Sequence, residues 1–230
     1  MTGSGTMRLV QLSAALAAGN EEALRRVMTG CMDQGEGEGK SVEEVILQSY
    51  LFLGYPVALN ALALWRKVSG REAPPPVEED WGGWGKRGAE VCETVYGGQY
   101  QDLRKNIRAL HPDMERWMVV EGYGKVLGRP GLSLKERELC IVAILAVENL
   151  PRQLYSHLRG ALNAGANVEE VEEAVALASS FTEPQAAAAA ERTWGQVRDR
   201  WTGGEDRSRR QSSGGRKPEE STPPESGPGS

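Results

Sequence analysis

The sequence predicts an all-α fold. Apolar residues recur every three or four positions, as at Leu9, Leu12 and Leu16, which is the spacing of one helix face. Two segments look like helix starts, a polar residue followed by acidic ones: Asn167-Val168-Glu169-Glu170 and Lys40-Ser41-Val42-Glu43-Glu44. No alternating run of Val, Ile and Thr indicates a sheet.

An internal repeat organises most of this helical sequence. A shift of 130 residues places Leu24 on Leu154 and Gly30 on Gly160. After a four-residue insertion the shift becomes 126, and Val42-Glu43-Glu44-Val45 falls on Val168-Glu169-Glu170-Val171. Each copy reads as three helices followed by an Ala-rich fourth, after Pro56 and after Pro184. We therefore predict a first repeat at 7–68 and a second at 132–201, packed as one pseudo-symmetric bundle.

The remaining parts of the chain differ in composition. Residues 69–80 contain Pro74-Pro75-Pro76 and are predicted to form a stiff linker. Residues 81–131 are a connecting segment rich in Gly and aromatic residues, with helices expected at 87–95, 100–110 and 112–126. The tail at 202–230 has no apolar residue, so we expect it to be disordered.

Charge and composition exclude several classes of protein. The 27 basic and 32 acidic residues give a net charge of −5, which argues against a nucleic-acid partner. Apolar runs fall short of a membrane span and the N-terminus shows no signal pattern, so we expect a soluble, cytoplasmic protein with no membrane partner. Three scattered cysteines and two histidines predict neither a disulfide framework nor a metal site, and we expect no cofactor.

Glu138 and His157 are the candidate catalytic residues. The turn between their two helices is expected at Glu148–Leu150, and the two residues lie about equally far from it. Residues equidistant from the turn of an antiparallel helix hairpin lie side by side, so a carboxylate should meet an imidazole in an apolar interior. Such a pair can transfer protons near neutral pH. The alternative is a structural core histidine held by a glutamate.

The first repeat supplies a contrast. Under the shift of 130 residues, Glu138 corresponds to Arg8 and His157 to Val27, while the apolar positions are kept. If the pair served packing alone, both repeats should need it. This difference favours a functional role for the pair.

These residues resemble the carboxymuconolactone decarboxylase family, of the AhpD-like fold. The resemblance rests on Arg137-Glu138-Leu139, on His157-Leu158-Arg159-Gly160-Ala161-Leu162, and on Gly165 with Glu169-Glu170-Val171. It covers roughly 8–68 and 86–195 and is weaker in the first repeat. The resemblance implies an AhpD-like helical bundle, here built from two degenerate repeats.

The peroxidase branch of the family uses a Cys-x-x-Cys pair before the histidine, and the chain lacks it. Leu150 and Gln153 occupy those two positions. Without the thiols a dithiol–disulfide cycle is not supported. Cys140 lies inside an apolar helix and is expected to be a buried small residue. Thiol peroxidase activity is therefore the disfavoured third function.

The decarboxylase branch lacks the cysteine pair and keeps the histidine. The resemblance implies a cofactor-free lyase or isomerase acting on a small carboxylated, lactone-like compound, with His157 as the acid and Glu138 setting its tautomer. An anionic substrate favours fixed cations, for which Arg129, Arg152 and Arg159 are candidates, and Tyr123 could add a hydrogen bond. For each arginine the alternative is a solvated helix surface, and for Tyr123 it is packing.

Two wider possibilities stay open at this point. The chain could instead be a non-catalytic oligomeric scaffold or binding module of the same fold. Single-repeat relatives resemble trimers or hexamers, so we expect a homo-oligomer of tandem chains, with a trimer favoured.

Overall fold

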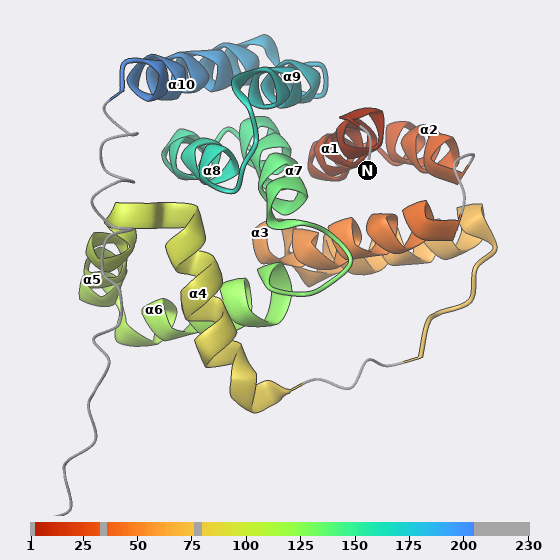
Figure 1. Ribbon diagram of the computed structural model, residues 1–230. Helices are drawn as coiled ribbons and strands as arrows, with labels where there is room; N and C mark the ends of the chain where they lie inside the picture. The colour runs from red at the N-terminus through yellow and green to blue at the C-terminus, as the bar shows by residue number, and fades with distance from the viewer. Residues whose placement is uncertain (1–2, 33–35, 76–79, 205–230) are drawn as a thin grey trace, which may run out of the picture.

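The computed structural model describes residues 3–32, 36–75 and 80–204 (Figure 1). Within these ranges the regular elements are helices and no β-strand occurs, which confirms the predicted all-α fold. The predicted linker and tail fall partly outside the described residues, at 76–79 and 205–230.

The first predicted repeat contains α1 (Gly3–Ala18), α2 (Glu21–Met32) and α3 (Glu36–Ser69). The element α3 consists of two helices that follow each other across a kink, in agreement with the third and fourth helices expected here. The kink lies at Gly54, whose φ of 80° and ψ of 166° are non-helical, two residues before Pro56. Glycine adopts this positive φ without a steric penalty, so the chain changes direction without an intervening loop.

The second predicted repeat contains α7 (Leu134–Val147), α8 (Pro151–Asn163), α9 (Val168–Ser179) and α10 (Pro184–Thr202). Capping boxes begin α7 at Ser133 and α9 at Asn167, where side chain and backbone satisfy each other's hydrogen bonds. The cap at Asn167 confirms that predicted helix start. A shift of 130 carries α1 and α2 onto the ranges of α7 and α8, in agreement with the repeat, which itself stays a prediction.

The connecting segment contains α4 (Trp84–Tyr96), α5 (Tyr100–Leu110), α6 (Pro112–Trp117) and the π-helix η3 (Met118–Leu127), with short 3₁₀ turns η1 (Trp81–Gly83) and η2 (Gly97–Gln99). The helix expected at 112–126 is therefore α-helical only in its first turns. Gly88 of α4 and Gly124 of η3 make a close approach possible: a Cβ at either would overlap the backbone carbonyl of Val119 or Trp84.

The helix α7 lies at the centre of the bundle. Its residues from Glu136 to Ala146 are all buried, and it packs against α1, α3, α8 and α9 (Figure 1). The segment Gly39–Ser69 of α3 is long and apolar enough to cross a membrane, with a mean hydropathy of 1.4. Length and composition alone are weak evidence for this, because core helices can share them.

Candidate functional site

Glu138 of α7 and His157 of α8 contact each other. The Oε2 atom of Glu138 lies 2.8 Å from Nδ1 of His157, a hydrogen-bond distance, and this confirms the predicted contact. The side chain of Glu138 is fully buried, while 9% of the His157 side chain is exposed. Because Glu138 engages Nδ1, Nε2 is the ring nitrogen that can face a ligand.

The carboxylate of Glu138 is tightly enclosed and only half satisfied. Its second oxygen, Oε1, is buried without a hydrogen-bond partner among the described residues. On its other side lies Gly160 of α8, where a Cβ would come 2.6 Å from Oε2 and 2.7 Å from Cγ1 of Val95. The absence of a side chain at Gly160 therefore lets α8 approach the carboxylate.

Aromatic side chains surround the pair. Phe52 of α3 lies edge-on to the His157 ring, with centroids 5.9 Å apart. The hydroxyl of Tyr123 in η3 donates to that of Tyr96 in α4 over 3.0 Å. Burial raises the pKa of both tyrosines, and the negative charge of Glu138 adds to the effect, so both hydroxyls stay protonated. Sequence reasoning missed Tyr96 and Phe52, because neither shares a motif or helix with His157.

The helix α4 is fastened onto α8 beside the pair. Asn163 of α8 donates from Nδ2 to the carbonyl oxygen of Val95 over 2.8 Å. Arg159 of α8 donates from Nη1 to Oε1 of Gln99 in η2 over 2.5 Å. Arg159, a predicted substrate-binding residue, therefore joins two elements of the protein rather than contacting Glu138 or His157.

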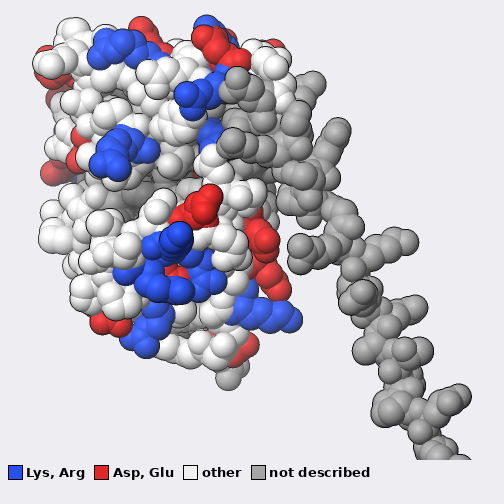
Figure 2. All heavy atoms as spheres, turned by 90° about the vertical axis from the view of Figure 1, so that its left-hand side faces the viewer, with Lys and Arg blue, Asp and Glu red and all other residues white. Residues whose placement is uncertain are grey.

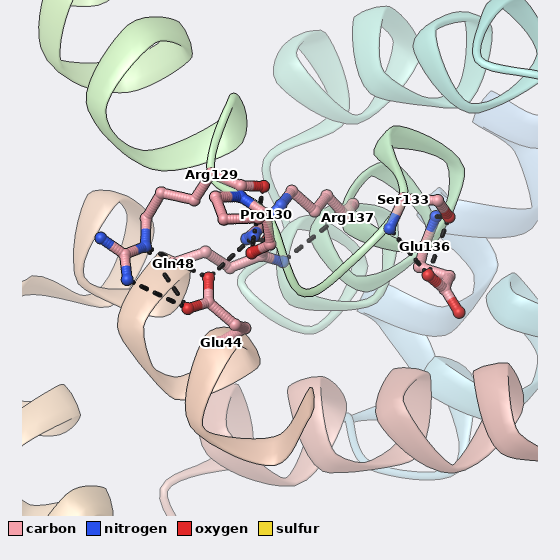
Figure 3. Close-up of polar contacts among 7 residues, drawn as sticks. All are labelled: Glu44, Gln48, Arg129, Pro130, Ser133, Glu136 and Arg137. Carbon is pink, nitrogen blue, oxygen red and sulfur yellow. Dashed lines mark hydrogen bonds and ion pairs between the residues drawn. The ribbon is translucent and has the colours of Figure 1, made fainter. Parts of the chain in front are cut away.

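Arg129 belongs to a separate ion network, which Figure 3 shows. Its Nη2 atom lies 3.2 Å from Oε1 of Glu44 in α3, away from the predicted catalytic pair. The fully buried Arg137 of α7 lies 2.8 Å from Oε2 of the same glutamate and 3.3 Å from Oε1 of Gln48. This network ties α3 to α7 and to the loop that precedes α7.

Arg152 lies elsewhere as well. It is exposed near the start of α8 and lines a hollow between α8 and α10. The structure thus brings together Glu138 and His157, places Tyr123 close to them, and leaves the three predicted arginines out of contact with the pair. Their role in holding a substrate stays a prediction.

Neither Glu138 nor His157 lines the hollow between α8 and α10, the hollow over α5 or the hollow beside α1 and α2. Arg8 and Val27, the predicted counterparts of the pair, line the last of these, of about 280 Å³. Across the described ranges, no three His, Cys, Asp or Glu side chains group in a way that could hold a metal.

The cysteines are unsuited to thiol chemistry. Cys31, Cys92 and Cys140 are buried and form no disulfide. Burial raises the pKa of Cys92 and of Cys140 to about 12, so the reactive thiolate is scarce near neutral pH.

The part of the chain that contains Glu138 and His157 is similar to a known protein family. Residues 112–193 match the model of the carboxymuconolactone decarboxylase family. This range includes Tyr123, Glu138 and His157.

Three relatives are similar over parts of their length. Peroxisomal protein 2 of Schizosaccharomyces pombe is 30% identical over 138 residues, which are 56% of this chain and 63% of the relative. Peroxisomal protein 2 of Saccharomyces cerevisiae is 31% identical over 88 residues, 38% of this chain and 31% of the relative. The nitrosuccinic acid decarboxylase npaB of Metarhizium robertsii is 32% identical over 97 residues, 41% of this chain and 66% of the relative. The matches therefore span less than two thirds of both yeast proteins.

Proposed function

We propose that the chain, whose residues 112–193 match the model of the carboxymuconolactone decarboxylase family, is a cofactor-free lyase or isomerase acting on a small carboxylated compound. In this proposal His157 donates the proton and Glu138 orients the imidazole. The similarity to a relative named nitrosuccinic acid decarboxylase supports this class of reaction.

The observation that carries the proposal is the buried, half-satisfied carboxylate next to a histidine. A fully buried carboxylate oxygen without a hydrogen bond costs stability, and such groups call for an explanation such as catalysis. A glutamate that served packing alone could be replaced by an apolar residue. The first repeat has such a replacement for the histidine, because Val27 stands at the predicted counterpart of His157.

The chemistry follows from the tautomer that Glu138 favours. When the bond between the substrate's α-carbon and its carboxylate breaks, carbon dioxide leaves and the electron pair stays on the carbon, delocalised into a neighbouring electron-withdrawing group. Protonated His157 donates its Nε2 proton to that carbon while Nδ1–H remains bonded to Glu138, and solvent returns a proton to the imidazole. General acid–base catalysis of this kind contributes roughly 10²–10⁴-fold in rate.

The test is release of carbon dioxide from nitrosuccinate and from 4-carboxymuconolactone, with His157→Gln and Glu138→Gln as variants. Each variant should lower the rate by at least about 100-fold while the circular dichroism spectrum and mass stay unchanged. The control is Arg8→Gln, at the predicted counterpart of Glu138, which should keep full activity. Wild-type levels of activity in His157→Gln would contradict the proposal, as would inactivity of the wild type on both compounds.

A non-catalytic scaffold or binding module is the second candidate. It is favoured by the enclosure of the pair, since the Glu138 side chain is fully buried and only 9% of the His157 side chain is exposed, and by two relatives whose names state no activity. This candidate expects no turnover and a His157→Gln variant that loses stability or assembly. Thiol peroxidase activity is third, and the buried thiols weigh against it.

We also propose a homo-oligomer, with a trimer favoured, located in the cytoplasm and without a nucleic-acid or membrane partner. Light scattering that shows a monomer would contradict the first point. Because two relatives are named as peroxisomal proteins, a fluorescent fusion of the chain should be imaged beside a peroxisomal marker, and co-localisation would overturn the cytoplasmic assignment.

A further inference from the structure

A basic hollow lies between α8 and α10, and neither Glu138 nor His157 lines it. Its volume is about 530 Å³, within the range of small-molecule sites. Two arginines, a tyrosine, two neutral polar residues and two apolar ones form its wall: Pro151, Arg152, Tyr155, Ala189, Arg192, Thr193 and Gln196.

The two arginines of this hollow differ from the other arginines that the structure describes. Across the described residues, neither Arg152 nor Arg192 forms a hydrogen bond or an ion pair, whereas every other arginine interacts with a neighbour. The chain has five more acidic than basic residues, so acidic partners are not scarce. Guanidinium groups bind carboxylates and phosphates, and this hollow presents two that are unpaired.

The basic surface over α5, which Figure 2 shows, lacks this property. There Arg104, Lys105 and Arg108 line a second hollow. Arg104 and Arg108 are both paired with Glu115, at 2.5 Å and 3.1 Å. Their charge is thus already neutralised in part, so α5 is the weaker candidate for an anion site.

The remaining wall of the hollow suits an organic body attached to the anion. Arg200 donates from Nη1 to the Tyr155 hydroxyl over 2.6 Å, and its guanidinium lies 5.8 Å from the centroid of that ring. The Tyr155 oxygen accepts this bond, so its own proton is available to a ligand oxygen. Pro151 and Ala189 supply apolar surface against which a ring or short chain can pack.

This hollow is distinct from the Glu138–His157 pair. Tyr155 and His157 are two residues apart on α8, and positions with this spacing point to nearly opposite sides of a helix. His157 faces α7 and Phe52, whereas Tyr155 faces the hollow and α10.

We propose that the hollow between α8 and α10 is a second binding site, which takes a small organic anion with a carboxylate or phosphate group on an apolar body. Arg152 and Arg192 bind the anionic group, and Tyr155 with the apolar wall binds the rest. The proposal does not depend on any reaction at His157.

The test is calorimetric titration of the full chain with benzoate, phenyl phosphate, inorganic phosphate and benzyl alcohol. Benzoate or phenyl phosphate should bind with one site per chain, and the tighter of the two identifies the preferred head group. Inorganic phosphate and benzyl alcohol should bind about tenfold more weakly, because the first lacks the apolar body and the second lacks the anionic group. Added salt should weaken binding, as it does for any charge-based contact with solvent access.

Variants locate the site. Arg152→Gln and Arg192→Gln should each weaken binding roughly 3- to 10-fold. The matched control is Arg25→Gln on α2, an exposed arginine paired with Glu21 outside the hollow, which should bind as the wild type does. His157→Gln should also bind normally.

Three results would overturn the proposal. The first is no binding of any probe at concentrations on the order of 10 mM. The second is binding that survives both arginine substitutions but is lost in His157→Gln, which would place the anion at the pair. The third is dissociation of an oligomer by Arg152→Gln in light scattering, which would make the hollow an interface between copies of the chain.

Discussion

Replacing Gly160 with alanine tests the enclosed geometry around Glu138. The new Cβ would lie 2.6 Å from Oε2 of Glu138, the oxygen that contacts His157, and 2.7 Å from Cγ1 of Val95. Contacts this short do not persist, so a neighbour must move. Both Glu138 and Val95 are buried, at 0% and 1% exposure, which leaves neither an easy alternative position.

The expected cost combines two opposing effects. Overpacking in a well-packed interior costs roughly 1–3 kcal/mol. Replacing a helical glycine by alanine returns about 0.4–1 kcal/mol through the unfolded chain and helix propensity. Gly160→Ala should therefore lower the free energy of unfolding by roughly 0.5–2 kcal/mol.

Gly30→Ala is the matched control. Gly30 is the predicted counterpart of Gly160, and a Cβ there would meet nothing within 4 Å. This variant should keep or slightly raise the free energy of unfolding. Urea unfolding followed by circular dichroism measures both variants, with equal m values showing that the extent of unfolding is unchanged.

A second measurement follows the pair directly. The chain has two histidines, so the proton resonances of the His157 ring can be assigned by comparison with a His111 variant. Gly160→Ala should shift these resonances and Gly30→Ala should leave them in place. If Gly160→Ala is as stable as the wild type and its His157 resonances do not move, the close packing around Glu138 is wrong.

The buried tyrosine, guanidinium and thiols allow three further tests. Burial raises the pKa of Tyr123 well above 10, so the folded chain holds this proton more tightly than the unfolded chain does. The contribution to the free energy of unfolding is therefore complete below pH about 10. It is lost at higher pH, by up to about 1.4 kcal/mol per pH unit. Tyr123→Phe should flatten that loss in urea unfolding between pH 10 and 11, and identical slopes would show that Tyr123 ionises while folded. Glu44→Gln leaves the fully buried Arg137 without its carboxylate and should lower the free energy of unfolding by about 3 kcal/mol. The double variant Glu44→Gln with Arg137→Met should regain part of this loss, because it removes the unpaired charge as well. Equal stability of the single and the double variant would contradict the importance of this ion pair. Burial raises the pKa of Cys92 and of Cys140 to about 12, so both should react with a thiol reagent only after unfolding. Fast reaction or peroxide-dependent oxidation of the folded chain would favour the peroxidase function again.

Local patterns predicted the parts of the fold that depend on neighbours in sequence. The helical class, the caps of α9 and the bounds of α5 follow from spacing and capping residues, and the structure has them. The contact of Glu138 with His157 was also predictable, because the geometry of a helix hairpin depends mainly on where its turn lies.

Interactions between distant segments were not predictable in this way. Arg129 looked available for a substrate, but Glu44, 85 residues earlier, pairs with it. Arg137 lies among apolar residues in the sequence, and a charged residue in that position indicates a buried ion pair. Its partner Glu44 lies 93 residues away, so the sequence did not identify it. The π-helical geometry of η3 was also not predicted, because the segment 112–126 was expected to form one helix.

The residues around His157 come from two different parts of the chain. Glu138, Tyr123 and His157 itself lie within the stretch that matches the family, whereas Phe52, Val95 and Tyr96 come from α3 and α4, before that stretch begins. If the pair moves protons as proposed, two proteins can share Glu138 and His157 and still admit different molecules to them. Exchanging α4 between such proteins, with α7 and α8 left untouched, would then change the selectivity while the proposed acid and its glutamate stay in place.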